Sequence, residues 1–160
     1  MSAEQEVVAN LRKHLSKKYE FPKRRNGNIK EFGFANRYDK NIKFDIFAYK
    51  IKRNDTEILL IECKGKTLRS LAQGYGQIIY YRTLFGKPKK EWLRKKFDKL
   101  GIDIRTQKNI KFGFAYHSDA YKSYRKILTR LANYYAYLGI RTYIVSKSKV
   151  RIIREKSLPS

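Results

Sequence analysis

The sequence predicts a single α/β domain over residues 1–160, with a central mixed β-sheet flanked by helices. β-prone runs and helical periodicities alternate in the order helix, three strands, helix, basic insertion, strand, helix, two strands. Such alternation favours a layered α/β fold over an all-helical or all-strand one. The 160 residues are enough to bury one hydrophobic core, and no repeat, low-complexity segment or linker divides them.

Hydrophobic spacing predicts a helix and three strands in the first half of the chain. Val7, Leu11 and Leu15 recur at helical spacing after Ser2, a common N-cap residue. Runs rich in Ile, Phe and Leu, bounded by polar turn residues, predict strands instead. The predicted elements are a helix over 3–18, a basic loop over 21–28 and strands over 29–38, 41–49 and 56–66.

The second half predicts two helices, a basic insertion and three strands. Ser118 and Asp119 are expected to cap the longer helix, and Gly139 to end it. The apolar stripe of this helix is expected to pack in the core, with a self-association face as the alternative; it comprises Tyr121, Tyr124, Leu128, Leu131, Tyr135 and Leu138. Trp92 is expected to pack, with stacking on a base as the alternative. The predicted elements are a helix over 68–85, a basic helical insertion over about 87–100, a strand over 110–117, a helix over 118–138 and a hairpin of strands over 141–145 and 150–154.

Charge is the most informative feature of the composition. The 38 Lys and Arg residues outnumber the 14 Asp and Glu residues, so the formal net charge is +24. This balance indicates a polyanionic partner, and nucleic acid is the leading candidate because neutralising phosphates releases counterions. An anionic membrane is the alternative, but no apolar run approaches the ~20 residues of a membrane span and no signal peptide opens the chain. The single cysteine, Cys63, excludes an internal disulfide and a cysteine zinc site and favours a cytoplasmic location.

Two acids and a lysine interrupt the apolar strands. Asp45 lies in N-I-K-F-D-I-F-A-Y, and Glu62 and Lys64 lie near the end of T-E-I-L-L-I-E-C-K-G-K. Because side chains alternate along a strand, Glu62 and Lys64 point to one face, and a hairpin would bring Asp45 onto it. Burying an unpaired carboxylate costs on the order of several kcal/mol. These acids therefore indicate a metal, a partner or a catalytic role, with a buried ion-pair network as the structural alternative.

This pattern resembles the PD-(D/E)XK nuclease superfamily. Asp45, followed on the next strand by Glu62-Cys63-Lys64, is similar to the superfamily's Asp and then Glu-x-Lys. Phe44 precedes the aspartate where the superfamily name has Pro, a residue that relatives often lack.

Two flanking segments extend the resemblance over roughly the first half of the chain. Residues 4–11, E-Q-E-V-V-A-N-L, look like the superfamily's first helix, in which a Glu precedes an amphipathic run. Residues 76–81, G-Q-I-I-Y-Y, look like the Gly-Gln-x-x-x-Tyr helix of RecB-like nucleases. The resemblance implies a restriction-endonuclease-like core.

The resemblance also implies a deoxyribonuclease that depends on Mg²⁺ or Mn²⁺. Such hard cations take oxygen ligands. Asp45 and Glu62 are expected to hold the metal together with the backbone carbonyl of Cys63. Glu4, preferred to Glu6 for its spacing in the first helix, is expected to reach a second metal.

Lys64 and Gln77 complete the expected catalytic set of Asp45, Glu62, Lys64 and Gln77. Lys64 is expected to position or activate the attacking water or to stabilise charge on the phosphate. Gln77 is expected to orient Lys64 or the scissile phosphate, with a solvated helix residue as the alternative.

The type of nuclease stays open at this point. A small basic domain resembles the archaeal Holliday junction resolvases, which are homodimers, whereas the Gly-Gln-x-x-x-Tyr helix resembles RecB-like exonucleases. The Lys-, Ile- and Tyr-rich composition is compatible with a thermophilic archaeon or its virus or plasmid, hence with a host cytoplasm.

Six cations are the expected DNA contacts. The first three belong to the loop over 21–28, where irregular basic segments commonly contact phosphates and a solvated surface loop is the alternative. The expected contacts are Lys23, Arg24, Arg25, Lys66, Arg69 and Arg82. A non-catalytic DNA-binding protein or a ribosomal-type RNA-binding protein would explain the charge equally well, but neither explains the acids in the strands.

Overall fold

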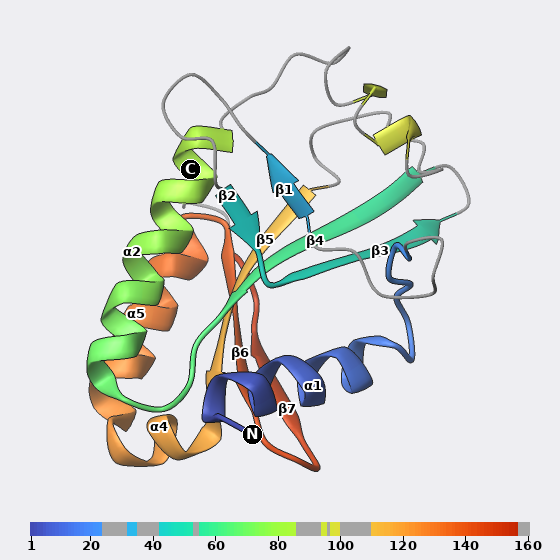
Figure 1. Cartoon of the computed structure of the whole chain (residues 1–160). Helices are drawn as coiled ribbons and strands as arrows, with labels where there is room; N and C mark the ends of the chain where they lie inside the picture. The colour runs from blue at the N-terminus through green and yellow to red at the C-terminus, as the bar shows by residue number, and fades with distance from the viewer. Residues whose placement is uncertain are drawn as a thin grey trace.

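A five-stranded mixed sheet forms the centre of the fold (Figure 1). The computed structural model describes residues 1–23, 32–34, 42–52, 55–85, 94–95, 97–99 and 110–156. Its helices are α1 (Ala3–Leu15), α2 (Leu68–Phe85), α4 (Ser118–Ser123) and α5 (Arg125–Tyr137). Its strands are β1 (Phe32–Phe34), β2 (Ile42–Phe44), β3 (Ile46–Lys52), β4 (Asp55–Cys63), β5 (Ile110–His117), β6 (Ile140–Val145) and β7 (Val150–Ile153).

The strands of the central sheet follow the order β3-β4-β5-β6-β7. β3 and β4 pair antiparallel, with Ile46 opposite Ile61. β4, β5 and β6 run parallel, and β7 returns antiparallel to β6. β1 and β2 form a separate two-stranded antiparallel sheet. The predicted class, an α/β fold with a central mixed sheet flanked by helices, is confirmed.

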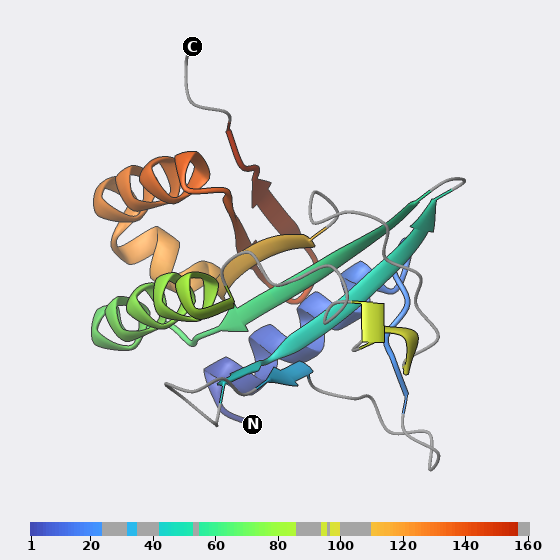
Figure 2. The ribbon, with the colours of Figure 1, turned by 90° about the horizontal axis from the view of Figure 1, so that it is seen from above.

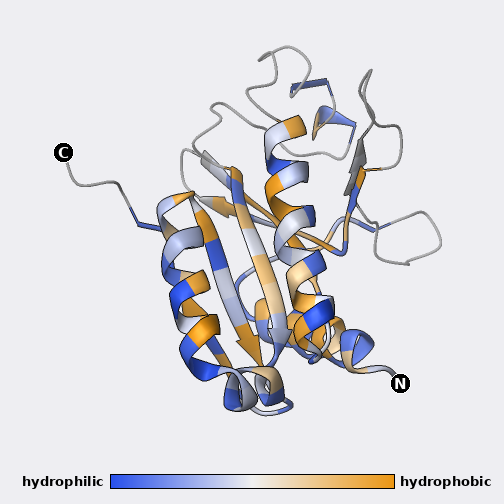
Figure 3. Ribbon diagram, turned by 90° about the vertical axis from the view of Figure 1, so that its left-hand side faces the viewer, coloured by the Kyte–Doolittle hydropathy of each residue, from blue (hydrophilic) through white to orange (hydrophobic). Residues whose placement is uncertain are grey.

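Helices cover both faces of the sheet, and each face has its own apolar core (Figure 2). On one face α1 buries Val7, Leu11 and Leu15. On the other face α2 and α5 lie over the strands (Figure 3), above buried side chains such as Ile58 and Leu60. Successive residues of β4 alternate between the two cores. β4 is therefore buried on both faces, which explains its nearly continuous apolar sequence.

Two predicted elements are interrupted. The strand expected over 41–49 bends at Asp45, which separates β2 from β3. The helix expected over 118–138 breaks at Tyr124, whose φ of −127° and ψ of 35° are not helical. The break produces the short α4 and the longer α5, and both interruptions were invisible to hydrophobic spacing because the apolar pattern continues through them.

The N-cap of α4 also differs from the prediction. His117 caps it, because its Nδ1 accepts a hydrogen bond from the backbone N–H of Asp119 at 3.0 Å. Other boundaries agree closely with the prediction: α2 and β5 have the expected bounds, and Gly139 follows α5 with a φ of +78°. α1 ends at Leu15, three residues before the predicted end at Lys18.

Part of the predicted organisation lies outside the described residues. Of the insertion over 87–100, only residues 94–95 and 97–99 are described, and Phe97 is fully buried with its ring 5.9 Å from that of Phe47. Trp92 and most of the loop over 21–28 fall outside them. Within the described part of the chain, no helix is long and apolar enough to cross a membrane.

Candidate active site

The bend between β2 and β3 brings Asp45 against the end of β4. Extending the register of Ile46 with Ile61 by one residue sets Asp45 beside Glu62. The Oδ2 atom of Asp45 accepts a hydrogen bond from the backbone N–H of Cys63 at 2.8 Å. The carboxylate of Asp45 is thus fixed to β4 by the backbone.

β4 ends at Cys63, three residues before the predicted end at Lys66; Glu62 in β4 and Lys64 just after it lie on the side of the sheet that α2 covers. Glu62 is buried, with 4% of its surface exposed. Its Oε1 atom lies 3.8 Å from Nζ of Lys64, an ion pair with little exposure on either side chain. Its Oε2 atom is buried and has no hydrogen-bond partner among the described residues. One buried carboxylate oxygen therefore lacks the partner that such atoms normally have.

The two carboxyl groups compete for too little positive charge. Burial raises the pKa of Glu62 to about 8, and the neighbouring charge of Asp45 adds to the increase. Burial also raises the pKa of Asp45, against the lowering effect of the N–H donor of Cys63. Lys64 lowers both pKa values but does not offset burial. Two adjacent acids that resist ionisation together form a site to which a cation would bind favourably.

Glu4 and Glu6 of α1 contact different parts of the molecule. Glu4 lines an open cleft of about 560 Å³ together with Asp45 and Arg12. Glu6 lies on the other side of the first turn, with Oε2 3.3 Å from Nε2 of His117. Of the two acids considered for the metal, Glu4 thus shares a cleft with Asp45 and Glu6 pairs with a histidine.

Arg12 is a residue of this cleft that sequence reasoning missed. Its Nη2 donates a hydrogen bond to the backbone carbonyl of Asp45 at 3.1 Å and so supports the bend. The available signal was spacing: Glu4, Val8 and Arg12 are four residues apart and line the same cleft.

Gly74 lets α2 approach Lys64 closely. A Cβ atom at Gly74 would lie 2.4 Å from the ring of Phe114 and 2.5 Å from Cγ of Lys64, so no larger residue fits without movement. A Cβ atom at Gly76 would meet nothing within 4 Å. Of the two glycines, only Gly74 is required by packing, and it holds α2 against the stem of the lysine.

Gln77 lies one turn further along α2. Four residues later, the ring of Tyr81 makes an edge contact with that of Phe44, centroid to centroid 5.6 Å. Gln77 is thus on the part of α2 between Gly74, which covers Lys64, and Tyr81, which covers the residue before Asp45. Its Oε1 atom is buried and has no hydrogen-bond partner among the described residues. The side-chain carbonyl of Gln77 is therefore available to bind a ligand on the α2 side of the sheet, the side on which Glu62 is buried.

The donor set suits a hard divalent cation. Asp45 and Glu62 offer carboxylate oxygens, one of them buried without a partner, and Mg²⁺ or Mn²⁺ binds such oxygens and retains several waters. Among the described residues there is no group of three or more His, Cys, Asp or Glu side chains that could hold a metal. The thiol of Cys63 is buried in the α1-side core, and burial raises its pKa, so only its backbone carbonyl remains as a candidate ligand.

The candidate DNA contacts that the structure describes lie in three separate places. Lys66 and Arg69 are exposed, in the connection after β4 and in the first turn of α2, and Nζ of Lys66 lies 3.9 Å from Oδ2 of Asp119. Arg82 is at the other end of α2, near Gly139. Lys23 is exposed beyond the C-terminal end of α1. Arg24 and Arg25 lie outside the described residues.

Comparisons with known proteins add no assignment. The chain matches no protein-family model, no curated protein and no solved structure.

Proposed function

We propose that this chain is a metal-dependent deoxyribonuclease that hydrolyses phosphodiester bonds at the Asp45–Glu62–Lys64 site. One observation carries the proposal: in a chain with a net charge of +24, Glu62 is buried beside a second acid with one oxygen unpartnered. A structural ion-pair network would be expected to satisfy its carboxylates. An acid pair short of positive charge is instead what a bound cation requires.

Mg²⁺ or Mn²⁺ would be held by Asp45 and Glu62, with the backbone carbonyl of Cys63 as a further oxygen donor. Glu4, which shares a cleft with Asp45, would reach a second metal. When bound, such a cation supplies Lewis acidity toward the phosphate and lowers the pKa of water. The protein positions the proposed ligands in advance. The backbone N–H of Cys63 holds the carboxylate of Asp45, and the carboxylate of Glu62 is buried beside it. Arg12 holds the bend from the backbone side.

Lys64 and Gln77 would act on the substrate side. The ammonium of Lys64 would donate hydrogen bonds to a phosphate oxygen or to the attacking water, and stabilise the negative charge that develops on the phosphate. Gln77 would orient that phosphate or the lysine through its side-chain amide. Gly74 serves both groups by keeping α2 close to the sheet.

DNA is the proposed substrate, and the exposed cations Lys66 and Arg69 support it because they follow Lys64 closely in the connection from β4 into α2. Contacts to the phosphate backbone provide affinity without reading sequence. A DNA end or a junction is the proposed structural feature of the substrate.

A homodimer is the proposed assembly if the chain acts on junctions. The outer side of α5 supports it, because Ile127, Tyr134 and Tyr137 are between 42% and 69% exposed there. Light scattering during size-exclusion chromatography would measure the mass directly, and a monomer at all concentrations would contradict this part of the proposal.

Cleavage assays with matched isosteric variants test the function. Labelled linear duplex, single-stranded and four-way-junction DNA are incubated with Mg²⁺, Mn²⁺ or EDTA. We expect Asp45→Asn and Glu62→Gln to lose at least about 100-fold in cleavage rate, the scale of losing one essential electrostatic group. Glu20→Gln, the same chemical change at an exposed acid, should cleave like the wild type.

The same assays define the alternative. Tight DNA binding without cleavage under every metal would show a non-catalytic nucleic-acid-binding protein. Equal cleavage by the wild type and Asp45→Asn would assign the activity to another site or a contaminant.

A further inference from the structure

A second charged region lies on the opposite face of the sheet, toward the C-terminal end of α1. A hollow of about 450 Å³ opens there between α1, β3, β4 and the strands beyond them. Its charged lining comprises Lys17, Lys18, Lys50, Lys111, Arg141, Arg154 and Glu57. Six cations thus line the hollow with one carboxylate.

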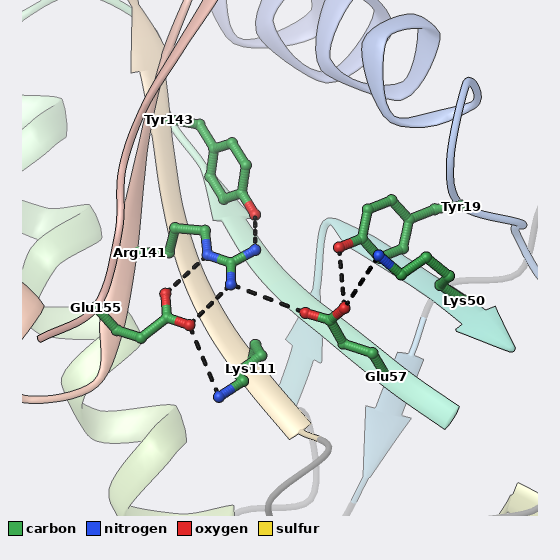
Figure 4. A network of polar contacts seen from close by, with 7 residues as sticks. All are labelled: Tyr19, Lys50, Glu57, Lys111, Arg141, Tyr143 and Glu155. Carbon is green, nitrogen blue, oxygen red and sulfur yellow. Dashed lines mark hydrogen bonds and ion pairs between the residues drawn. The ribbon is translucent and has the colours of Figure 1, made fainter. Parts of the chain in front are cut away.

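A chain of polar contacts centred on Arg141 lies in this hollow (Figure 4). Arg141, whose side chain is only 5% exposed, donates two hydrogen bonds of 2.8 Å to Glu155. Its Nη2 also lies 3.8 Å from Glu57, which accepts a hydrogen bond from Tyr19 and pairs with Lys50 at 3.6 Å. The two acids of the network are therefore occupied by internal cations and do not neutralise the rim.

The rim carries cations without acidic partners. Lys17, Lys18 and Arg154 are exposed, and none of them forms an ion pair with a described carboxylate. Concentrating exposed like charges in one place is unfavourable unless something of opposite charge is bound there. The rim therefore points to an anionic ligand.

A smaller hollow of about 220 Å³ extends this surface. It shares His14 and Lys17 with the first hollow and is lined further by Lys13 and by the turn between β6 and β7, with Lys147 and Lys149. No acid lines it among the described residues. We call the two adjoining hollows the basic trough.

We propose that the basic trough is a second nucleic-acid-binding surface, which binds the phosphodiester backbone away from the Asp45–Glu62 site. Two adjoining cationic hollows suit a chain of phosphates better than a single phosphate, and the Ser146 to Lys149 turn adds Lys147 and Lys149 to the lining that contains Lys17. The trough lies on the α1 side of the sheet, opposite the α2 side on which Glu62 is buried, and is lined by the last residues of α1 and the segment that follows it. It would therefore contact a different part of the same nucleic acid. This proposal concerns binding and does not depend on cleavage.

Two triple variants with the same change in charge test the proposal. The trough variant is Lys13→Gln/Lys17→Gln/Lys147→Gln, and the control is Lys122→Gln/Lys126→Gln/Arg130→Gln on α4 and α5. All six residues are exposed, and none is in the proposed catalytic site. Fluorescence anisotropy with EDTA measures the Kd of a labelled duplex of about 20 base pairs across a range of salt concentrations. Circular dichroism checks that both variants are folded.

We expect the trough variant to bind at least about 10-fold more weakly than the control, and its slope of log K against log salt to fall by about 2–3. If both variants lose the same DNA affinity relative to the wild type, binding depends on the overall positive charge and the proposal is wrong. If neither variant loses affinity, the proposal is also wrong. Loss of binding to phosphatidylserine vesicles without loss of DNA binding would also overturn it, and would identify a membrane-binding surface.

The design separates this proposal from the nuclease proposal. Asp45→Asn should bind DNA in EDTA like the wild type and fail to cleave it. The trough variant should cleave at saturating DNA with a wild-type rate and need more DNA to reach saturation. If no protein cleaves, the anisotropy comparison still decides whether the trough binds.

Discussion

The pKa values of two glutamates on opposite faces of the sheet, the buried Glu62 and the half-buried Glu155, are shifted in opposite directions. Burial raises the pKa of Glu62 to about 8, and a neighbouring acid adds to the effect. Hydrogen bonds from Arg141 lower the pKa of Glu155 to about 2. The environments differ in the supply of cations: Glu155 has a bidentate arginine, whereas Glu62 shares one lysine with Asp45.

This difference distinguishes the Arg141–Glu155 pair, which we interpret as structural, from the Asp45–Glu62 pair, which we interpret as a candidate active site. Buried charges are tolerated when each is paired and hydrogen-bonded, as in the Arg141 network. The pair of Asp45 and Glu62 has less compensation: Lys64 pairs with Glu62 and the Cys63 N–H binds Asp45, but burial still raises the pKa of both acids, so ionising both costs free energy. Retaining such a cost is typical of residues with a chemical role.

The largest effect on stability is expected at Arg141, the centre of the network that joins Glu155 and Glu57. Arg141→Ala should lower the free energy of unfolding by about 3–5 kcal/mol, because it leaves Glu155 and Glu57 without their buried partner. Urea denaturation measures the change. Arg154→Ala, an exposed arginine on the same hollow, should change stability by less than about 0.5 kcal/mol. A similar loss in both variants would show that the network is not a structural cluster.

The two glycines of α2 should respond with opposite signs. Gly74→Ala should destabilise the protein by about 1–3 kcal/mol, because the new methyl group overlaps Phe114 and Lys64. Gly76→Ala should stabilise it by about 0.5–1 kcal/mol, because the site is open and alanine favours the helix. Thermal unfolding of the two variants measures both. If the two variants changed the stability equally, α2 would not pack tightly against Lys64 at Gly74.

Glu155 should stabilise the protein in a defined pH range. Its folded pKa lies below the unfolded value, so its contribution is full above about pH 4.5 and is lost as the pH falls toward 2. Glu155→Gln should therefore cost about 2 kcal/mol at neutral pH and almost nothing near pH 2. Urea denaturation at several pH values measures the difference, and a constant difference across this range would contradict the assigned pairing.

Glu62 should show the opposite behaviour in metal-free protein. Its folded pKa lies above the unfolded value, so it lowers stability as the pH rises from about 4.5 to 8. Glu62→Gln, which mimics the protonated acid, should raise stability by about 1–2 kcal/mol at neutral pH in EDTA. Loss of stability in this variant would mean that the carboxylate is satisfied in the fold.

Much of the fold follows from local sequence patterns. The bounds of α2 and β5 are predictable because their apolar spacing is regular and turn residues surround them. The bend at Asp45 and the break at Tyr124 are not, because tertiary contacts such as the Cys63 N–H to Asp45 bond decide them while the apolar pattern continues.

The candidate site was partly predictable for the same reason. Strand alternation puts Glu62 and Lys64 on one face, and the hairpin adds Asp45. The Arg141–Glu155 pair was not predicted, because Arg141 in β6 and Glu155 just after β7 look like ordinary charges of a basic chain. Only the sheet shows that Arg141 is buried there.

Metal-dependent thermal stability tests the central contrast most directly. Mg²⁺ or Mn²⁺ at about 100 times its Kd should add about 2.7 kcal/mol to the wild type, or about 5–10 °C in Tm. We expect this increase in the wild type and in Glu20→Gln, and its loss in Asp45→Asn and Glu62→Gln. An equal increase in all four proteins, or none in the wild type, would contradict a metal site at Asp45 and Glu62.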